Sequence, residues 1–289
     1  MILITGATGH FGKATIQHLL NNGIPAKNIA ALVRDENKAA DLKSSAVNIV
    51  VGDYDDKASL VKAFSGIDKL LFVSGSDVVK RGEQQKTVVA AAKEAGVPYI
   101  LYTSFERSTE DGSSPVAFIA GSHLETEKDI KASGIPYTFF RNNLYADFIP
   151  MFIGEKVLEN GVYWPSGEGK LSAAVRDEMA EAAAKVLASD GHEGKEYFIS
   201  TEENVSFKDV ADIISEASGK EVAFISPTQA EYKATLTAAG VPSEYVNMFA
   251  GFAEAIRQGE FETRQHDLSR LLGRKATSVK EFLAGQYKA

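Results

Sequence analysis

The feature that most constrains the fold is a glycine-spaced turn close to the first residue. Gly6, Gly9 and Gly12 follow an apolar run at residues 2–5 and open an amphipathic stretch at residues 12–22. A strand, a G-x-x-G-x-x-G turn and a helix in this order are typical of a dinucleotide-binding βαβ unit. Gly6 permits the tight turn, Gly9 lets the backbone approach a pyrophosphate, and Gly12 lets the helix pack closely on the strand. The alternative is a glycine-rich turn that binds nothing.

Short apolar runs alternate with amphipathic stretches along the first 140 residues. Such alternation predicts βαβ units whose parallel sheet is covered by helices. We therefore expect an α/β protein of the Rossmann type with a doubly wound parallel sheet, and we place this dinucleotide-binding core at residues 1–145. Further strands are expected at 29–33, 47–51, 70–73, 99–102 and 137–140, and helices at 58–64, 84–94 and 123–132.

The pattern loosens after residue 145. Residues 146–289 are expected to form a smaller mixed α/β lobe over the crevice at the carboxyl ends of the strands, where open α/β sheets bind ligands. The boundary is soft, and the lobe is expected to interleave with the core. Helices are expected near 146–159, 177–188, 207–218 and 278–286, and short strands at 197–200 and 221–225.

Composition excludes several classes of function. The formal net charge of −8 argues against a nucleic-acid partner. The chain has no cysteine, and its five histidines lack close metal-ligand spacing, so no metal site is expected. No apolar run approaches the ~18 residues needed to cross a bilayer, and the N-terminus does not look like a signal peptide. We expect a cytoplasmic protein without a membrane partner, and a homodimer is compatible with the sequence.

The glycine turn and the helix after it are expected to bind the cofactor's phosphates. The first amides of a helix have no intrahelical partner and carry partial positive charge, so they attract anions. The residues expected to contact the cofactor here are Gly6, Thr8, Gly9, His10, Phe11 and Gly12.

The end of the second expected strand indicates which dinucleotide is bound. NAD-binding proteins usually place an acidic residue there to hold the ribose 2′-hydroxyl. In this chain Arg34 ends the strand and Lys38 follows one helical turn later. A guanidinium can fork onto a 2′-phosphate and a lysine adds a point charge, which favours NADP(H) over NAD(H). The alternative is a pair of solvated surface cations.

Three more strand ends are candidate cofactor contacts. Asp53 follows the third strand and could flank the adenine, or serve only as a turn residue. Ser74 and Gly75 follow the fourth strand, beside the expected dinucleotide, and could equally be an ordinary loop. Thr103 and Ser104 end the fifth strand, where they border the nicotinamide or merely terminate the strand.

Several segments together resemble a known family. They are ITGATG at 4–9, HLETEK at 123–128, RNNLY at 141–145 and GEGK at 167–170. Nearly end to end, the chain resembles the NmrA-like branch of the atypical short-chain dehydrogenase/reductases, and within it the bacterial type-2 NAD(P)H:quinone oxidoreductases and triphenylmethane reductases. The first segment is widespread among reductases, whereas the second and third are far more specific.

One departure from the wider superfamily bears on the chemistry. Ordinary members use Tyr-x-x-x-Lys, whose tyrosine gives or takes a proton. Alignment back from Gly134 places His123 at the lysine position and Ile119 at the tyrosine position. A carbonyl substrate would then develop an alkoxide with no acid nearby. The resemblance implies acceptors that are already electrophilic, such as a quinone or a triarylmethyl cation. Hydride can pass to these directly, without flavin or metal.

The resemblance also suggests roles for individual residues. His123 is expected to hold the nicotinamide ribose and to relay a proton as the catalytic residue, although a lone helix histidine is more often structural. Asn143 is expected to bind the nicotinamide carboxamide. The expected wall of the pocket for a small aromatic acceptor consists of Tyr145, Phe148, Phe152 and Trp164, for which core packing is the alternative.

Two functions therefore compete. The first is an NADPH-dependent reductase of quinones or similar electron-poor aromatics. The second is a non-catalytic NADP redox sensor, because some NmrA-like proteins bind NADP without turnover. A nucleotide-sugar epimerase would need the tyrosine that the alignment does not find.

Overall fold

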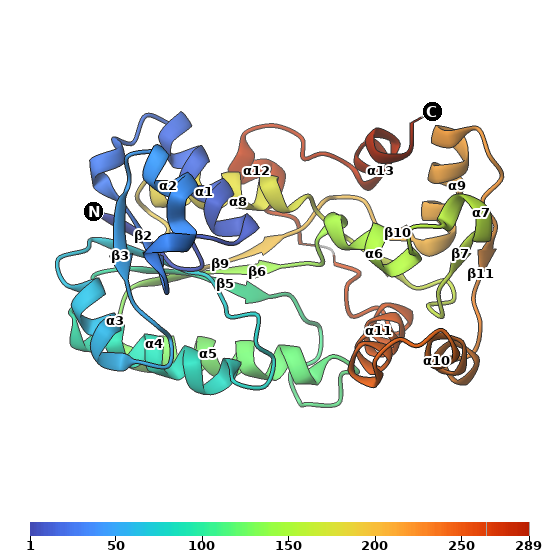
Figure 1. Ribbon diagram of the computed structural model, residues 1–289, viewed down its shortest axis with the longest axis horizontal. Coiled ribbons are helices and arrows are strands. Elements are labelled where there is room, and N and C mark those ends of the chain that lie inside the picture. The colour runs from blue at the N-terminus through green and yellow to red at the C-terminus, as the bar shows by residue number, and fades with distance from the viewer. Residues whose placement is uncertain (264, 289) are drawn as a thin grey trace.

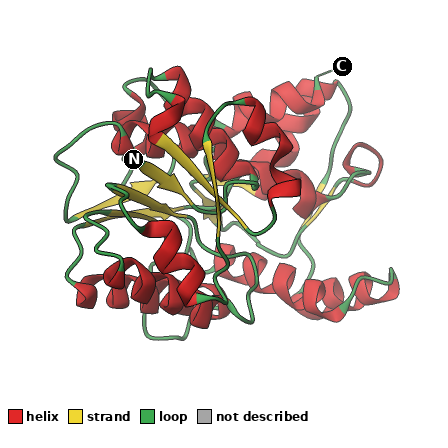
Figure 2. Ribbon diagram, turned by 60° about the vertical axis from the view of Figure 1, so that its left-hand side comes forward, coloured by secondary structure: helices red, strands yellow, loops and turns green. Residues whose placement is uncertain are grey.

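The computed structural model describes residues 1–263 and 265–288, and the side chain of Lys38 is also outside the description. At its centre is a seven-stranded sheet with the order β3-β2-β1-β4-β5-β6-β9, and every neighbouring pair is parallel. Figures 1 and 2 show helices on both faces of this sheet. The strands are β1 (Ile2–Ile4), β2 (Ile29–Val33), β3 (Asn48–Val51), β4 (Lys69–Phe72), β5 (Ile100–Phe105), β6 (Tyr137–Asn142) and β9 (Lys195–Ile199).

The strands bury both faces, as expected for a sheet covered by helices on each side. Leu3 faces one core cluster, whereas its neighbours Ile2 and Ile4 face the other. The cluster with Leu3 includes α3 (Lys57–Phe64), α4 (Arg81–Glu94) and α5 (Ala117–Ser133). The opposite face is covered by α1 (His10–Asn21), α8 (Arg176–Leu187) and α12 (Leu268–Leu272), with η2 (Glu36–Ala39) and α2 (Ala40–Ser44) at its edge.

The sheet extends beyond the first half of the chain. Strand β9 pairs with β6, and helix α8 packs against α1. The second half thus interleaves with the first, because its own strand and helix complete the sheet and its cover. The order of the strands reverses between β1 and β4, which makes this pair the topological switch point where such sheets bind ligands.

The remaining elements form a second lobe, at the right of Figure 1. Its core includes Trp164, Phe207 and Phe252. The helices are α6 (Ile149–Ile153), α7 (Val157–Asn160), α9 (Phe207–Ser218), α10 (Gln229–Ala238), α11 (Ser243–Arg257) and α13 (Val279–Tyr287); the short strands are β7 (Val162–Tyr163), β8 (Lys170–Leu171), β10 (Val205–Ser206) and β11 (Phe224–Ile225).

Prediction of this lobe was uneven. Helix α9 has the predicted bounds, and Ser206 begins it with a capping box to Asp209. The helix expected over 146–159 is wrong, because the chain forms a 3₁₀ turn, η3 (Ala146–Phe148), followed by α6 and α7. Gly154 separates those two helices with φ of 81°. Helices α10 and α11 were not predicted. Among the helices of the described residues, none is long and apolar enough to cross a membrane.

Candidate active site

A cleft of about 410 Å³ lies over the switch point. It is lined by the ends of β1 to β4 and the loops that follow them. Seven of the predicted cofactor contacts line it together: Gly6, Thr8, Gly9, Arg34, Asp53, Ser74 and Gly75. The topology therefore joins residues nearly seventy positions apart in the sequence into one site.

The glycine turn has the geometry that its sequence predicts. Gly6 has φ of +57°, which favours glycine, and a Cβ on Gly12 would lie 2.4 Å from the Gly6 carbonyl oxygen. Only glycine at position 12 lets the helix approach the turn so closely. His10 is exposed at the start of α1, whereas Phe11 is buried in the core, so neither side chain lines the cleft.

Arg34 directly follows β2, and its side chain is exposed at the cleft. The neighbouring Asp35 carboxylate is turned to its own backbone: it accepts a hydrogen bond from the Asn37 amide as the N-cap of the next turn. The predicted partner Lys38 lies outside the described side chains. The cleft rim thus presents a guanidinium where NAD-binding proteins usually present a carboxylate.

A second cavity of about 160 Å³ adjoins the cleft, and Ser74 lines both. Its walls come from both halves of the chain. Thr103, Ser104, His123, Asn143, Tyr145 and Phe148 were predicted as site residues and line it. Six further lining residues, Arg81, Phe105, Ile119, Asn142, Leu144 and Phe252, were not predicted as site residues. Ile119, placed at the tyrosine position by the alignment, lines the cavity with a side chain that has no proton to give.

His123 stands in a buried chain of hydrogen bonds. Its Nε2 lies 3.3 Å from Arg81 Nη1, and its Nδ1 lies 2.8 Å from the Tyr102 hydroxyl. An arginine only donates, so Nε2 must accept, and Nδ1 therefore carries the proton and donates it to Tyr102. The Tyr102 hydroxyl in turn donates to Gln85. Both ring nitrogens of His123 are thus held by protein groups.

Burial and the neighbouring Arg81 and Arg107 lower the pKa of His123 to about 3. The imidazole is therefore neutral at physiological pH. The ring of Phe105 stacks on it, with centroids 5.7 Å apart. His123 is held as a neutral, oriented group in the cavity wall.

Two adjacent asparagines line the cavity and differ in their hydrogen bonds. Asn143 donates both amide hydrogens within the protein, to Glu106 and to the Phe261 carbonyl, each over 3.1 Å. Asn142 lines the same cavity, is 4% exposed, and has no hydrogen-bond partner for either amide atom among the described residues. Of these two amides, that of Asn142, one residue before the predicted Asn143, is therefore the one whose hydrogen-bonding capacity the described residues leave unused.

The structure does not bring Phe152 and Trp164 to this cavity. Their rings stack with centroids 4.8 Å apart in the core of the second lobe, and neither lines the cavity. Core packing was the alternative for these aromatic residues, and for these two it holds. The cavity has an aromatic side chain from Phe252 of α11 instead, which the sequence analysis missed because Phe252 lies more than a hundred residues from the other lining residues.

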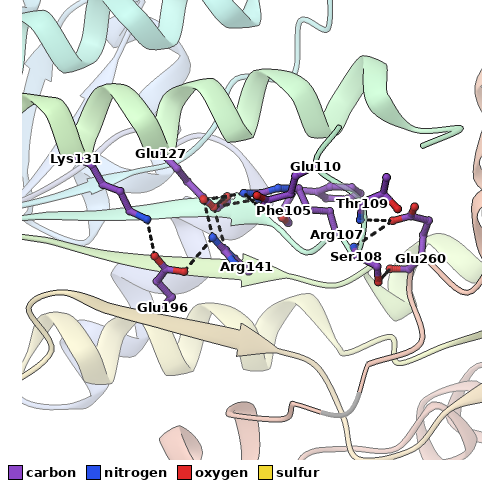
Figure 3. A network of polar contacts seen from close by, with 11 residues as sticks. Phe105, Arg107, Ser108, Thr109, Glu110, Glu127, Lys131, Arg141, Glu196 and Glu260 are labelled. Carbon is purple, nitrogen blue, oxygen red and sulfur yellow. Dashed lines mark hydrogen bonds and ion pairs between the residues drawn. The ribbon is translucent and has the colours of Figure 1, made fainter. Parts of the chain in front are cut away.

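A buried ion cluster fixes the strand ends beside the cavity (Figure 3). Glu127 binds Arg107 and Arg141, each with a shortest contact of 2.8 Å, and accepts a hydrogen bond from the Ser104 hydroxyl. Burial alone would raise the pKa of Glu127, but the two arginines outweigh it and lower the pKa to about 2. Glu127 thus has a structural role, and the hydroxyl hydrogen of Ser104, which lines the cavity, is already donated to Glu127. The cluster continues from Arg141 to Glu196 and Lys131.

The loop after β5 is also tied to the second lobe. Glu260 accepts hydrogen bonds from the amides of Ser108 and Thr109, as Figure 3 shows. Close by, Glu106 is buried against the segment that follows α11, and its burial raises its pKa to about 7. The contacts of this loop therefore join the two lobes at the cavity. No cluster of metal-ligating side chains occurs in the part of the chain that the structure describes.

The sheet order and the glycine turn at its switch point define a Rossmann-type α/β protein. A model of the NmrA-like family matches residues 1–283, and the chain belongs to that family.

Curated relatives and solved structures agree with this placement. Quinone oxidoreductase 2 of Escherichia coli is 36% identical over 285 residues, with 98% of each chain covered. The NAD(P)H azoreductase of Xenophilus azovorans is 31% identical over 84% of this chain and 82% of its own. The triphenylmethane reductase of Citrobacter, solved with NADP(H), superimposes with a TM-score of 0.91 at 39% identity, covering 99% and 100% of the two chains. The E. coli NADPH-dependent quinone oxidoreductase, solved with NADPH, gives 0.93 at 34% identity over the full length of both.

Proposed function

We propose that this protein transfers hydride from NADPH directly to a quinone or a similar electron-poor aromatic acceptor. It is an NAD(P)H-dependent oxidoreductase of the NmrA-like family. The observation that carries the finer proposal is the pair of adjoining sites, a polar cleft with Arg34 at its rim and an aromatic cavity with Ile119 in its wall. They share Ser74, so a ligand that fills the cleft can reach the cavity.

The residues of the cleft fit an NADP(H) molecule. The tight turn at Gly6 and the free amides at the start of α1 suit a pyrophosphate, and Arg34 suits a 2′-phosphate. Asn142 offers a buried amide with no protein partner, which suits the nicotinamide carboxamide. When bound, the reduced nicotinamide supplies the hydride, so the proposal needs neither flavin nor metal.

The cavity fits a flat, conjugated acceptor. Tyr145 and Phe148 lie in its wall with ring centroids 5.2 Å apart, and Phe252 adds a third ring from the second lobe. Aromatic walls of this kind stack well on planar ligands. Burial raises the pKa of the Tyr145 phenol, so it stays protonated. An acceptor that delocalises the incoming charge needs no strong acid beside it, which agrees with the neutral His123 and the apolar Ile119.

The names of the relatives point to the same class of acceptor. They include a quinone oxidoreductase, an azoreductase and a triphenylmethane reductase. Each of the three named acceptor types is conjugated and accepts electrons readily. We propose the same class for this protein, while its cytoplasmic location and a homodimer stay predictions from the sequence.

A redox sensor is the second candidate, favoured by the fact that both ring nitrogens of His123 are held by protein groups. The two functions separate in one assay. Purified protein is mixed with NADPH and p-benzoquinone or menadione, and NADPH absorbance is followed beside NADPH titration calorimetry. Sustained, protein-dependent oxidation supports the reductase. Tight NADPH binding without turnover on either quinone supports the sensor, and absence of binding would overturn both.

A further inference from the structure

Arg81 is a buried cation without an acidic partner. Arg81 is 7% exposed, and its Nε donates to the Gly75 carbonyl oxygen over 2.8 Å. Its Nη1 donates to Nε2 of His123. Among the described residues, no carboxylate lies within ion-pair distance of this guanidinium.

The second terminal nitrogen of Arg81, Nη2, has no hydrogen-bond partner among the described residues. Yet Nη2 is not among the buried polar atoms that are sealed from solvent without a partner. Arg81 lines the cavity with the aromatic walls and does not line the cleft. The free hydrogens of this guanidinium are therefore presented to a molecule in the cavity.

Charge balance makes this position unusual within the same site. Arg107 is also buried and Arg141 is partly buried, but Arg107 pairs with Glu127 and Glu110, and Arg141 pairs with Glu127 and Glu196. Burial lowers the pKa of Arg81, and the nearby Tyr102 and Asp77 offset this only in part. A buried charge without a partner is costly, and such sites are often functional. The missing partner is therefore expected to be an anion that forms in the cavity.

We propose that Arg81 is a catalytic residue that stabilises the oxyanion of a quinone as it accepts hydride. This inference rests on the proposed quinone reduction. The quinone gains one hydride, which is a proton together with two electrons, and becomes a hydroquinone monoanion. The negative oxygen is bound by the Nη2 hydrogens of Arg81, and a proton from water then completes the hydroquinone. Arg81 thus stabilises the negative oxygen by its charge, whereas the tyrosine of ordinary members of the superfamily would do so by giving a proton.

His123 is a positioning residue in this scheme. Its Nε2 accepts from Nη1 of Arg81, and the Gly75 carbonyl accepts from Nε, so the guanidinium is held at two points. A neutral imidazole is required for this, because a protonated ring would have no lone pair for Arg81. The lowered pKa of His123 therefore agrees with its role of positioning the Arg81 guanidinium.

The proposal predicts opposite behaviour for two acceptors. A quinone becomes an anion on accepting hydride, whereas a triarylmethyl cation becomes neutral and needs no proton. A fixed guanidinium in the cavity favours the first reaction and repels the second acceptor. The charge of Arg81 is thus expected to select neutral, oxygen-bearing acceptors over cationic ones.

The test compares Arg81→Gln, which keeps hydrogen-bond donors but removes the charge, with Arg81→Lys, which keeps the charge. The control is Lys86→Met, which removes an exposed cation from the same helix. For each, kcat and KM are measured with menadione and with malachite green, NADPH affinity is measured by calorimetry, and folding is checked by thermal unfolding. We expect Arg81→Gln to lower kcat for menadione about 100-fold, because the charge that stabilises the oxyanion is lost, with NADPH affinity changed less than threefold; this size is typical of a lost oxyanion-stabilising contact. Arg81→Lys should retain at least a tenth of wild-type kcat, and malachite green reduction by Arg81→Gln should be equal to or faster than that by wild type.

A loss of less than tenfold with menadione, an equal loss with both acceptors, or a matching loss of NADPH affinity would overturn the role of Arg81. If Arg81→Gln does not fold, Arg81→Lys decides, because lysine keeps the charge but loses the fork of the guanidinium. A ratio of menadione to malachite green turnover below that of wild type then supports the role of Arg81, and an unchanged ratio overturns it. Failure of the wild-type protein to oxidise NADPH with menadione would instead overturn the proposed function itself.

Discussion

The Nδ1–H of His123 donates to the Tyr102 hydroxyl over 2.8 Å, and this single bond fixes the tautomer of a histidine in the cavity wall. Because Nε2 accepts a hydrogen bond from Arg81, it carries no proton, and the imidazole ring is neutral. Its environment holds the pKa at about 3, because burial opposes the charged form and two arginines repel it. His123 therefore orients its neighbours and does not exchange protons near neutral pH.

The first prediction concerns this tautomer. In a long-range ¹H–¹⁵N spectrum, the ring of His123 should show the neutral Nδ1–H form at every pH from 5 to 8. The other histidines provide the comparison, and the His123→Gln spectrum identifies the signal by its loss. A titration of this ring between pH 5 and 8, or a neutral Nε2–H form, would contradict the hydrogen-bond chain.

The second prediction concerns cofactor choice. Replacing Arg34 with Ala should weaken NADPH binding by ~1.5–3 kcal/mol, the usual worth of hydrogen bonds to a charged group, and should leave NADH binding almost unchanged. The control Lys62→Ala removes an exposed cation that does not line the cleft. Calorimetry with both nucleotides measures the difference. Equal losses for NADPH and NADH would show that Arg34 does not bind the 2′-phosphate.

The third prediction concerns the buried ion cluster. Replacing Glu127 with Gln removes the buried carboxylate that Arg107 and Arg141 share and leaves them only their more exposed partners, Glu110 and Glu196. Breaking a buried ion pair in this way typically costs about 3–5 kcal/mol of stability. The matched control is Glu110→Gln, because Glu110 also binds Arg107 but is half exposed, and should lose less than about 1 kcal/mol. Urea unfolding at pH 7 measures both. Similar losses for the two variants would mean that the cluster does not depend on Glu127.

The pKa of Glu127 gives the pH range in which this stabilisation acts. The folded-state pKa of about 2 lies below the ordinary value of 4.5, so the folded protein binds this proton less readily than the unfolded chain. Its contribution is complete above pH 4.5 and is lost as the pH falls toward 2. The difference between wild type and Glu127→Gln should therefore shrink on acidification through this range.

The sequence predicted the fold well wherever the signal was local. The glycine turn, the alternating apolar runs and the capping residue Ser206 each act within a few positions, so the βαβ core and α9 could be identified. The residues of the cleft were also predictable. In a parallel sheet the strand ends meet at one edge, so Arg34, Asp53 and Ser74 had to converge.

The cavity was harder because its walls depend on distant packing. Phe252 reaches it from α11, and nothing near Phe252 in the sequence marks it as a site residue. Asn142 and Asn143 are adjacent, and only their partners show that the second has donated its amide hydrogens and the first has not. Arg81 was missed because the helix was expected to begin at residue 84, so its first turn was read as loop.

The last prediction concerns Glu106, at the contact between the two lobes. Its burial raises its pKa to about 7, and hydrogen bonds from Thr263 and Asn143 with the charge of Arg141 lower it only in part. The folded protein therefore holds this proton more tightly than the unfolded chain, whose pKa is 4.5. Stability linked to this group falls as the pH rises from 4.5 to 7 and then stays constant.

Replacing Glu106 with Gln removes this titration and keeps an oxygen to accept from Asn143. The difference in the free energy of unfolding, variant minus wild type, should rise by roughly 2 to 3 kcal/mol from pH 5 to pH 8, as follows from 1.36 kcal/mol per pKa unit. Subtracting the two proteins at each pH cancels the opposite contribution of His123, whose lowered pKa makes stability fall on acidification below pH 6.5. The control Glu83→Gln changes an exposed carboxylate on α4 and should give no such trend. A constant difference between wild type and Glu106→Gln across this pH range would show that Glu106 is ionised in the folded protein throughout, and that the lobes meet around a charge.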